Sequence, residues 1–170
     1  FARSAKSANI LRPMLRALAV QGEIKLINKV NSILLQDDGA LPDIEFNGSG
    51  KAVAADAYAL VQSKASKWGS VENPHYWSKK HEKDIDIIFG ENPAQLFIED
   101  EAECFHVLFS GITSTSGRAI PDIGFFVLDK DFISLDYRKG KYWNESGIIG
   151  LFELMEELSL LSYKTEIRHE

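Results

Sequence analysis

The sequence predicts an α+β fold, in which helices come first, an antiparallel meander of about five strands follows, and a C-terminal helix packs on the sheet. Two observations predict it. Five short β-rich runs follow one another between Asp84 and Arg138, with turn residues between them. Apolar residues at helical spacing then cover residues 145–160. Short strands joined by tight turns pair antiparallel, and a helix buries one face of such a sheet.

The first part of the chain, residues 1–68, is predicted to be mainly helical. Apolar residues there recur three or four positions apart, which is the period of a helix with one buried face. A stretch rich in Gly, Asp and Pro interrupts this pattern and predicts a loop. The expected elements are a helix from residue 12, a second helix over 23–36, a loop over 37–50, a third helix over 52–68 and an irregular polar connection over 69–83.

The five β-rich runs make up the predicted sheet. Phe105, Val107 and Phe109 alternate with residues that are also largely apolar, so their run is expected at the centre of the sheet. A two-residue turn at Asp129 and Lys130 is expected to join the last two runs. The runs are residues 84–89, 94–99, 103–111, 122–129 and 131–138.

The last helix has a clear start signal. Asn144 is a favourable N-cap residue, and Trp143 before it can pack on Ile148 in the first turns of the helix. After the helix, residues 162–169 can add an edge strand. A chain of 170 residues and 19.0 kDa is expected to form a single α+β domain, with the sheet and its helix in residues 84–170.

The composition is that of a soluble globular protein. Hydrophobic residues make up 45% of the chain and charged residues 26%, and the apolar runs are too short to span a bilayer. Cys104 is the single cysteine, which excludes an internal disulfide and fits a reducing cytoplasm. The first 22 residues contain four basic and no acidic residues, for which an amphipathic helix is favoured over an organelle-targeting signal.

The net charge of −6 is distributed unevenly. Residues 1–83 carry twelve Lys and Arg against eight Asp and Glu, a balance of +4, whereas residues 84–170 carry seven against seventeen, a balance of −10. An acidic half repels the phosphates of nucleic acids and favours a basic protein partner. Simple solubility is the alternative explanation.

Two groups of carboxylates concentrate this charge. One comprises Glu153, Glu156 and Glu157 on the last helix, and the other places four carboxylates in five residues between two runs. Aromatic residues near the ends of elements can anchor a partner beside such carboxylates. A solvated turn is the alternative interpretation of the second group. The residues predicted to bind the partner are Glu99, Asp100, Glu101, Glu103, Trp77 and Tyr142.

We predict no catalytic, cofactor-binding or metal-binding site. His75, His81 and Asp84 carry suitable metal donors, but their spacing matches no standard ligand geometry. Cys104 and His106 lie two positions apart and point the same way on a strand, although a cysteine in such a run is more often a small apolar residue.

The glycine, hydroxyl and arginine groups of Ser110–Arg118 can cradle an anion, yet the segment runs into a strand instead of the helix that a phosphate-binding loop requires. An ordinary connection is the favoured interpretation. The alternative function is therefore a small hydrolase or nucleotide-handling enzyme that uses this segment or the histidines His75 and His81.

A further indication comes from the sequence L-D-Y-R at residues 135–138, which Gly140, Trp143 and an apolar, acidic helix follow. This segment resembles small bacterial immunity proteins of contact-dependent-inhibition and polymorphic-toxin systems, which often end a sheet with a comparable D-Y-R…W segment before a helix. The resemblance covers the C-terminal part of the chain. It implies a non-enzymatic cytoplasmic protein that binds and blocks a toxin domain, commonly a basic nuclease, and has no fixed catalytic residues.

Overall fold

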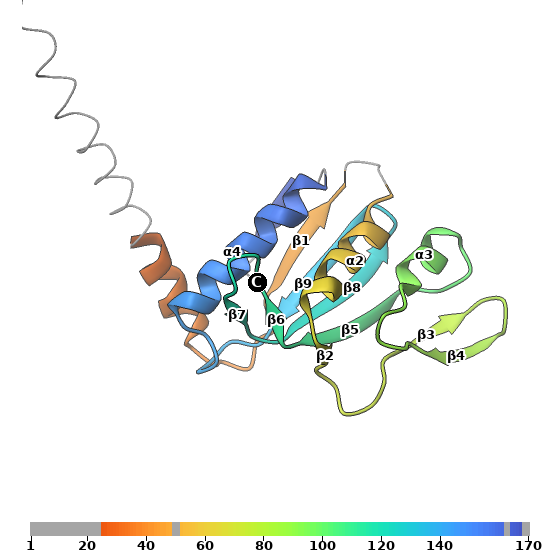
Figure 1. The fold of residues 1–170 in the computed structure, drawn as a ribbon, viewed down its shortest axis with the longest axis horizontal. Coiled ribbons are helices and arrows are strands. Elements are labelled where there is room, and N and C mark those ends of the chain that lie inside the picture. Colours follow the sequence, from red (N-terminus) through yellow and green to blue (C-terminus); the bar gives the residue numbers. More distant parts are fainter. Residues whose placement is uncertain (1–24, 49–51, 162–163, 168–170) are drawn as a thin grey trace, which may run out of the picture.

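The fold is a layer of helices on an antiparallel sheet. The computed structural model describes residues 25–48, 52–161 and 164–167. Within these ranges, six strands form the main sheet in the order β10–β1–β9–β8–β5–β2, and each neighbouring pair is antiparallel (Figure 1). Helix α4 lies between β9 and β10 in the chain and packs on the sheet. The α+β prediction with a C-terminal helix on the sheet is confirmed.

The elements have the following bounds. The main sheet consists of β1 (Asp43–Asn47), β2 (Lys67–Trp68), β5 (Phe105–Ser110), β8 (Ile123–Asp129), β9 (Phe132–Tyr137) and β10 (Lys164–Ile167). Two hairpins lie outside it, formed by β3 (His75–Ser78) with β4 (Lys83–Asp86) and by β6 (Ile112–Thr113) with β7 (Ala119–Ile120). The helices are residues 25–34, α2 (Ala54–Lys64), α3 (Pro93–Ile98) and α4 (Glu145–Leu160).

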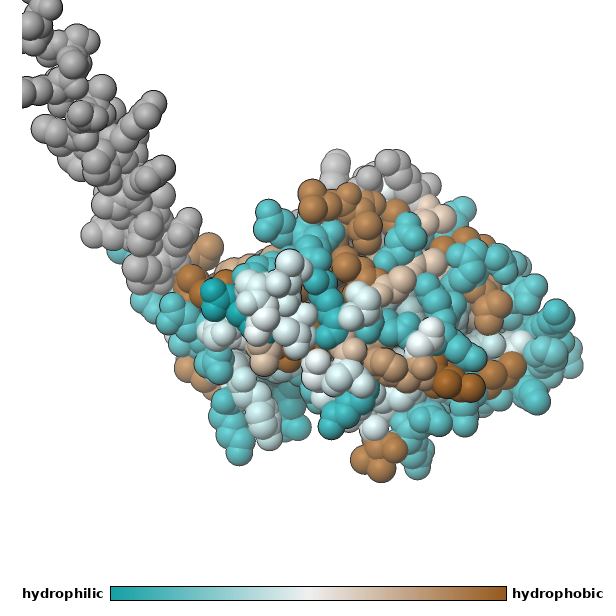
Figure 2. Space-filling model, in the orientation of Figure 1, coloured by the Kyte–Doolittle hydropathy of each residue, from teal (hydrophilic) through white to brown (hydrophobic). Residues whose placement is uncertain are grey.

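The core lies between the sheet and the two helices α2 and α4, which cover the same face of the sheet (Figure 1). Tyr58 of α2 is fully buried at its centre, with edge-on ring contacts to Phe105, Phe109 and Phe125 at centroid distances of 5.4 to 6.0 Å. The outer surface on this side mixes hydrophilic and apolar side chains (Figure 2). The core therefore accounts for the apolar residues of one sheet face only.

The opposite face carries the residues that alternate with the buried ones along each strand. His106 on β5 and Leu128 at the end of β8 are exposed, and Phe126 and Asp136 are half-buried. Among the described residues, this is the face on which the sheet meets solvent, and one face of an antiparallel sheet often does so.

Helix α4 begins as the sequence predicts. The Asn144 side-chain oxygen accepts a hydrogen bond from the Gly147 backbone N–H at 2.9 Å, which satisfies one of the donors left free at a helix start. Trp143 and Ile148, the expected apolar pair, are both buried. None of the described helices combines the length and the apolar character needed to cross a bilayer.

Of the five predicted sheet runs, one is wrong and one forms a strand outside the main sheet. Residues 94–99 form most of helix α3 instead of a strand, because Pro93 has the fixed φ of a first helical turn and packs with Ala94 against α2. Of residues 84–89, Asp84–Asp86 are extended, but they pair with β3 outside the main sheet. The runs that became β5, β8 and β9 are confirmed as strands. The expected central position of β5 is wrong, because β5 lies second from one end of the sheet and only the two-residue strand β2 lies beyond it.

The predicted loop over 37–50 contains a strand of the main sheet. In β1, Ile44 and Phe46 face the core, and two inward residues are too few to reveal a period in the sequence. The predicted connection over 69–83 likewise contains β3. The third helix ends at Lys64 instead of residue 68, and the turn after Asp129 uses Lys130 and Asp131, one residue later than expected.

The helix predicted over 23–36 is confirmed at residues 25–34, and the edge strand expected within 162–169 is β10. The predictions for residues 1–24, a helix from residue 12 and no targeting signal, lie outside the described residues.

Candidate functional site

The acidic turn, residues 99–103, connects α3 to β5 at one end of the sheet. Glu99, Asp100 and Glu103 are exposed, and Glu101 is half-buried. Asp100 has a φ of 62°, a left-handed conformation that turns the chain sharply and that Asp tolerates better than most residues. Its carboxylate forms an ion pair with Lys79. The turn therefore presents several carboxylates and one nearby lysine to solvent.

The structure brings Trp77 beside the acidic turn. The Glu103 N–H donates a hydrogen bond to the Trp77 carbonyl at 3.0 Å, and the Lys79 N–H donates to the Glu101 carbonyl at 2.9 Å. These bonds fix the end of β3 against the turn. The Trp77 side chain is 40% exposed, which is high for so large an apolar residue.

Tyr142 lies at the other end of the sheet. It follows β9, whose last residue, Tyr137, pairs with Ile123 of β8. Ile123 in turn pairs with Phe109 near the end of β5. The acidic turn precedes the start of β5. Tyr142 is 66% exposed, but the structure does not bring it together with the other five predicted residues.

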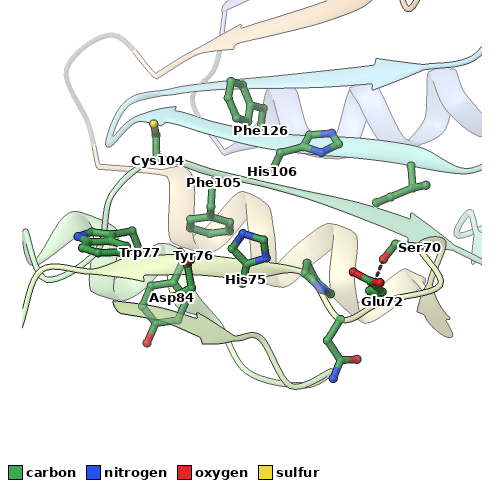
Figure 3. A pocket seen from close by; sticks show the side chains of 13 residues that line it. Ser70, Glu72, His75, Tyr76, Trp77, Asp84, Cys104, Phe105, His106 and Phe126 are labelled. Atoms are coloured by element: carbon green, nitrogen blue, oxygen red, sulfur yellow. Dashed lines mark hydrogen bonds between the residues drawn. The ribbon is translucent and has the colours of Figure 1, made fainter. Parts of the chain in front are cut away.

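A groove of about 510 Å³ lies between β3 and β5, beside Trp77 (Figure 3). Its volume is within the range of small-molecule and peptide sites. One wall comes from the sheet, with Cys104, His106 and Phe126, and the other comes from β3 and the segment before it (Figure 3). The lining residues are Ser70, Glu72, Asn73, Pro74, His75, Tyr76, Trp77, Asp84, Cys104, Phe105, His106, Leu108 and Phe126.

His106 is held in place on the sheet wall of this groove. Its Nε2 lies 2.7 Å from Oδ2 of Asp136, which belongs to β9. The contact therefore crosses β8, the strand between β5 and β9. Gly124 of β8 lies between them, and a side-chain carbon there would overlap the Asp136 carboxylate and the His106 ring. The pair is therefore possible only because residue 124 is glycine. Sequence reasoning missed this pair, since its members are 30 residues apart.

The predicted histidine pair is not brought together at one site. His75 lines the groove between β3 and β5, whereas His81 lies in the exposed turn between β3 and β4. In the described part of the chain, no three His, Cys, Asp or Glu residues are placed to hold one metal ion. Cys104 is an exposed free thiol on the groove, and His106 beside it hydrogen-bonds Asp136.

The segment Ser110–Arg118 binds carboxylates of this chain. The Ser116 hydroxyl lies 2.7 and 2.8 Å from the two Glu153 carboxylate oxygens, and Arg118 Nε lies 3.4 Å from one of them. Hydrogen bonds from Ser114 and Ser116 are the main cause that lowers the pKa of Glu153 to about 2. The groups that predicted an anion cradle thus hold the Glu153 side chain.

The Glu157 carboxylate is also bound by side chains of this chain. The Thr115 hydroxyl donates to its carboxylate at 2.6 Å, and Lys64 Nζ forms an ion pair with it at 2.8 Å. Burial opposes ionisation of Glu157, but the hydrogen bonds from Lys64 and Thr115 outweigh that effect and lower its pKa. Of the three carboxylates expected on α4, Glu156 alone is exposed.

The D-Y-R…W segment has a structural role. The rings of Tyr137 and Trp143 meet edge-on at a centroid distance of 5.4 Å, and Trp143 Nε1 donates to the Arg138 carbonyl at 2.8 Å. The Gly140 N–H donates to the Leu34 carbonyl at 2.6 Å. These contacts fold the connection from β9 to α4 against the core.

Comparisons with protein-family models, with curated proteins and with solved structures find no significant match to the chain.

Proposed function

We propose that this protein is a non-enzymatic binding protein whose acidic surface recognises a basic protein. Specifically, it is an immunity protein that neutralises a cognate toxin by occluding it. The observation that carries the proposal is the position of Trp77 beside the acidic turn. An exposed tryptophan next to several carboxylates combines the two components of a protein-binding hot spot, a large apolar anchor and charges that select the partner.

The distribution of negative charge supports the same surface. Glu153 and Glu157 are engaged by Arg118, Lys64 and the hydroxyls of the β6–β7 connection. Their charge is therefore largely satisfied within the chain, whereas Glu99, Asp100 and Glu103 of the acidic turn are exposed, with Lys79 as the neighbouring cation. Complementary charge of this kind mainly accelerates association.

The resemblance of the D-Y-R…W segment supports the immunity assignment and a cytoplasmic location. Its residues hold the sheet to α4, so we propose that they maintain the scaffold and that partner recognition belongs to the acidic turn and Trp77.

The test requires a candidate toxin, and a large secreted protein encoded immediately upstream of the gene would supply one. Co-expression with this chain is expected to restore growth of cells that produce the toxin domain. The variant Glu99→Lys/Asp100→Lys/Glu101→Lys should slow association with the purified domain by roughly tenfold or more at low salt, and by less at moderate salt.

The matched control reverses three exposed carboxylates on the helices, Asp56→Lys/Glu145→Lys/Glu156→Lys, and changes the net charge by the same amount. If the turn is the interface, the control slows association much less than the turn variant. Equal effects of both variants would show that the turn is not the interface. If the wild-type chain gives no protection, the protein is not an immunity protein for this toxin.

A small hydrolase that uses the groove is the second candidate. One observation favours it: His75 and His106 line the same groove, and Asp136 orients the His106 ring. The segment Ser110–Arg118 offers no free cradle, since its groups hold Glu153. Hydrolysis of chromogenic ester or phosphate substrates that is lost in both His106→Ala and Asp136→Asn would establish the enzyme.

A further inference from the structure

We propose that the outer edge of the β3–β4 hairpin binds an extended, basic segment of the partner, which pairs with β4 as an additional antiparallel strand. This inference deepens the proposed function and rests on it, because it names the part of a basic partner that the protein recognises. The edge lies one strand away from Trp77, which pairs with Asp84 of β4, and it contains no residue of the acidic turn.

Strand β4 is the outer strand of its hairpin (Figure 1). On its inner side, β3 is held to the segment before β5 by the Ser78–Ala102 bridge and by the hydrogen bond from Glu103 to Trp77. Within the described ranges, β4 pairs with β3 and with no other strand. An unpaired strand edge is a template for an additional extended chain.

The hairpin register gives the direction of the backbone groups of β4. The Ile87 N–H donates a hydrogen bond to the Pro74 carbonyl at 2.7 Å, so the backbone groups of Ile87 face β3. Peptide groups alternate sides along an antiparallel strand, and those of Ile85 therefore face β3 as well. The N–H and C=O groups of Asp84 and Asp86 point the other way, to the open edge.

A second hydrogen bond agrees with this direction. Trp77 and Asp84 lie directly opposite each other in the hairpin. The Trp77 carbonyl nevertheless accepts its hydrogen bond from the Glu103 N–H, on the side away from β4. The two residues are therefore a pair without mutual hydrogen bonds, and the backbone groups of Asp84 remain on the outer side of the hairpin.

A groove of about 690 Å³ lies along this edge, and its volume is within the range of ligand sites. Four successive residues of β4 line it, although their side chains point alternately to the two faces of the hairpin. This places the groove beside the strand instead of over one of its faces. The lining residues are Asn73, His81, Lys83, Asp84, Ile85, Asp86 and Ile88.

The side chains of the edge select a basic segment. Asp84 and Asp86 are exposed, and residues two apart on a strand share one face. Opposite charges on directly opposed residues of neighbouring strands are favourable. A bound strand is therefore expected to place Lys or Arg opposite each aspartate and an apolar residue opposite Ile85, which is half-buried. The expected pattern is basic, apolar, basic.

A second copy of this chain fits the same edge poorly. Two β4 strands can pair about a two-fold axis with outward-facing backbone groups opposite one another. A pairing centred on Asp84 sets this residue against itself, and a pairing centred on Ile85 sets Asp84 against Asp86. Both registers bring like charges together, which is destabilising. The charge of the edge therefore favours a basic partner over self-association.

The first experiment uses synthetic peptides and amide-resolved NMR of the full chain. The probe is the acetylated and amidated peptide Val-Lys-Val-Lys-Glu, and its charge control is Val-Glu-Val-Glu-Lys. With a Kd on the order of 1 mM, about 5 mM of the lysine peptide should slow hydrogen exchange at the Asp84 and Asp86 amides about sixfold. The Ile85 amide, which already faces β3, should not change. No slowing at either aspartate, or equal slowing by the control peptide, would overturn the proposal.

A second experiment tests the backbone pairing itself. In the expected register the N–H groups of the two peptide lysines face β4, and those of the central valine and the glutamate face away. One version of the peptide carries N-methyl groups on both lysines, and the other carries them on the central valine and the glutamate. Strand pairing predicts that only the first version loses binding. Retention of binding by the lysine-methylated version would contradict the pairing.

A charge reversal of the edge tests the recognition of a basic segment. The variant Asp84→Lys/Asp86→Lys should weaken binding of the lysine peptide by about three- to tenfold. The matched control, Asp56→Lys/Glu156→Lys, changes the net charge by the same amount at exposed positions on α2 and α4. It should bind the peptide as the wild type does. Equal weakening in both variants would mean that net charge alone attracts the peptide, which contradicts recognition by the edge.

Failure of this inference is distinguishable from failure of the proposed function. If the peptide does not bind while the reversed acidic turn still slows toxin association, the inference about β4 fails and the proposed function stands. If the peptide binds as expected while the wild-type chain gives no protection against the toxin, the immunity function fails and the pairing at β4 stands.

Discussion

Glu153 of α4 accepts hydrogen bonds from the hydroxyl of Ser116, which belongs to the connection between β6 and β7. The two residues are 37 positions apart, and Arg118 adds a contact from the same connection. This carboxylate occupies the hydroxyl and guanidinium groups that the sequence offers as an anion cradle. The connection is thereby fastened to α4, which itself packs on the sheet.

The replacement Glu153→Gln is expected to flatten the dependence of stability on pH in acid. The pKa of Glu153 is about 2 in the folded chain against an ordinary 4.5, so the folded state favours the ionised form. That stabilisation is complete above pH 4.5 and is lost as the pH falls toward 2. Urea unfolding of the wild type and the variant between these pH values measures it.

The matched control for this prediction is Glu156→Gln, on the exposed side of the same helix. Its stability should fall with pH as steeply as that of the wild type. A Glu153→Gln variant with the wild-type slope would mean that the Ser116 contact does not hold the carboxylate ionised.

The replacement Gly124→Ala is expected to destabilise the fold by about 1–3 kcal/mol, because the added methyl group overlaps the Asp136 carboxylate and the His106 ring. In a His106→Ala/Asp136→Ala background the same replacement should be neutral, or stabilising by about 0.5–1 kcal/mol, since alanine is the less flexible residue. Thermal or urea unfolding of the wild type, the Gly124→Ala variant, the double variant and the triple variant gives the coupling free energy between position 124 and the His106–Asp136 pair. If Gly124→Ala lowers the free energy of unfolding equally in both backgrounds, the overlap with His106 and Asp136 is not the cause.

The replacement Tyr58→Phe is expected to leave stability unchanged or to raise it by about 1 kcal/mol. The Tyr58 hydroxyl is buried and has no hydrogen-bond partner among the described residues, and an unsatisfied buried group is costly. Tyr58→Ala also removes the three ring contacts in the core and should cost about 3–5 kcal/mol. A clear loss of stability in Tyr58→Phe, measured by urea unfolding, would mean that the hydroxyl is satisfied.

The replacement Asn144→Ala is expected to cost about 1 kcal/mol, because the Gly147 N–H loses its acceptor at the start of α4. Asn144→Asp keeps an acceptor and should retain most of the stability. Thermal unfolding of both variants checks this, and equal losses would show that the cap contributes little.

The sequence by itself predicted the elements whose signals are local. The start of α4 depends on Asn144 and its neighbours in the chain, and β8 and β9 are short β-rich runs separated by a turn. Strand β1 has two inward residues, and α3 is a six-residue helix made of residues that also suit strands. Their identity was decided by neighbours distant in the chain.

The groups brought together in space were likewise decided by the tertiary structure. Trp77 meets the acidic turn, His106 meets Asp136 over Gly124, and Ser116 meets Glu153. A helix cap or a turn is fixed by groups a few bonds apart, so it leaves a pattern in the sequence. Contacts between elements form only when buried faces pack and set the strand register, and that packing is a property of the whole chain.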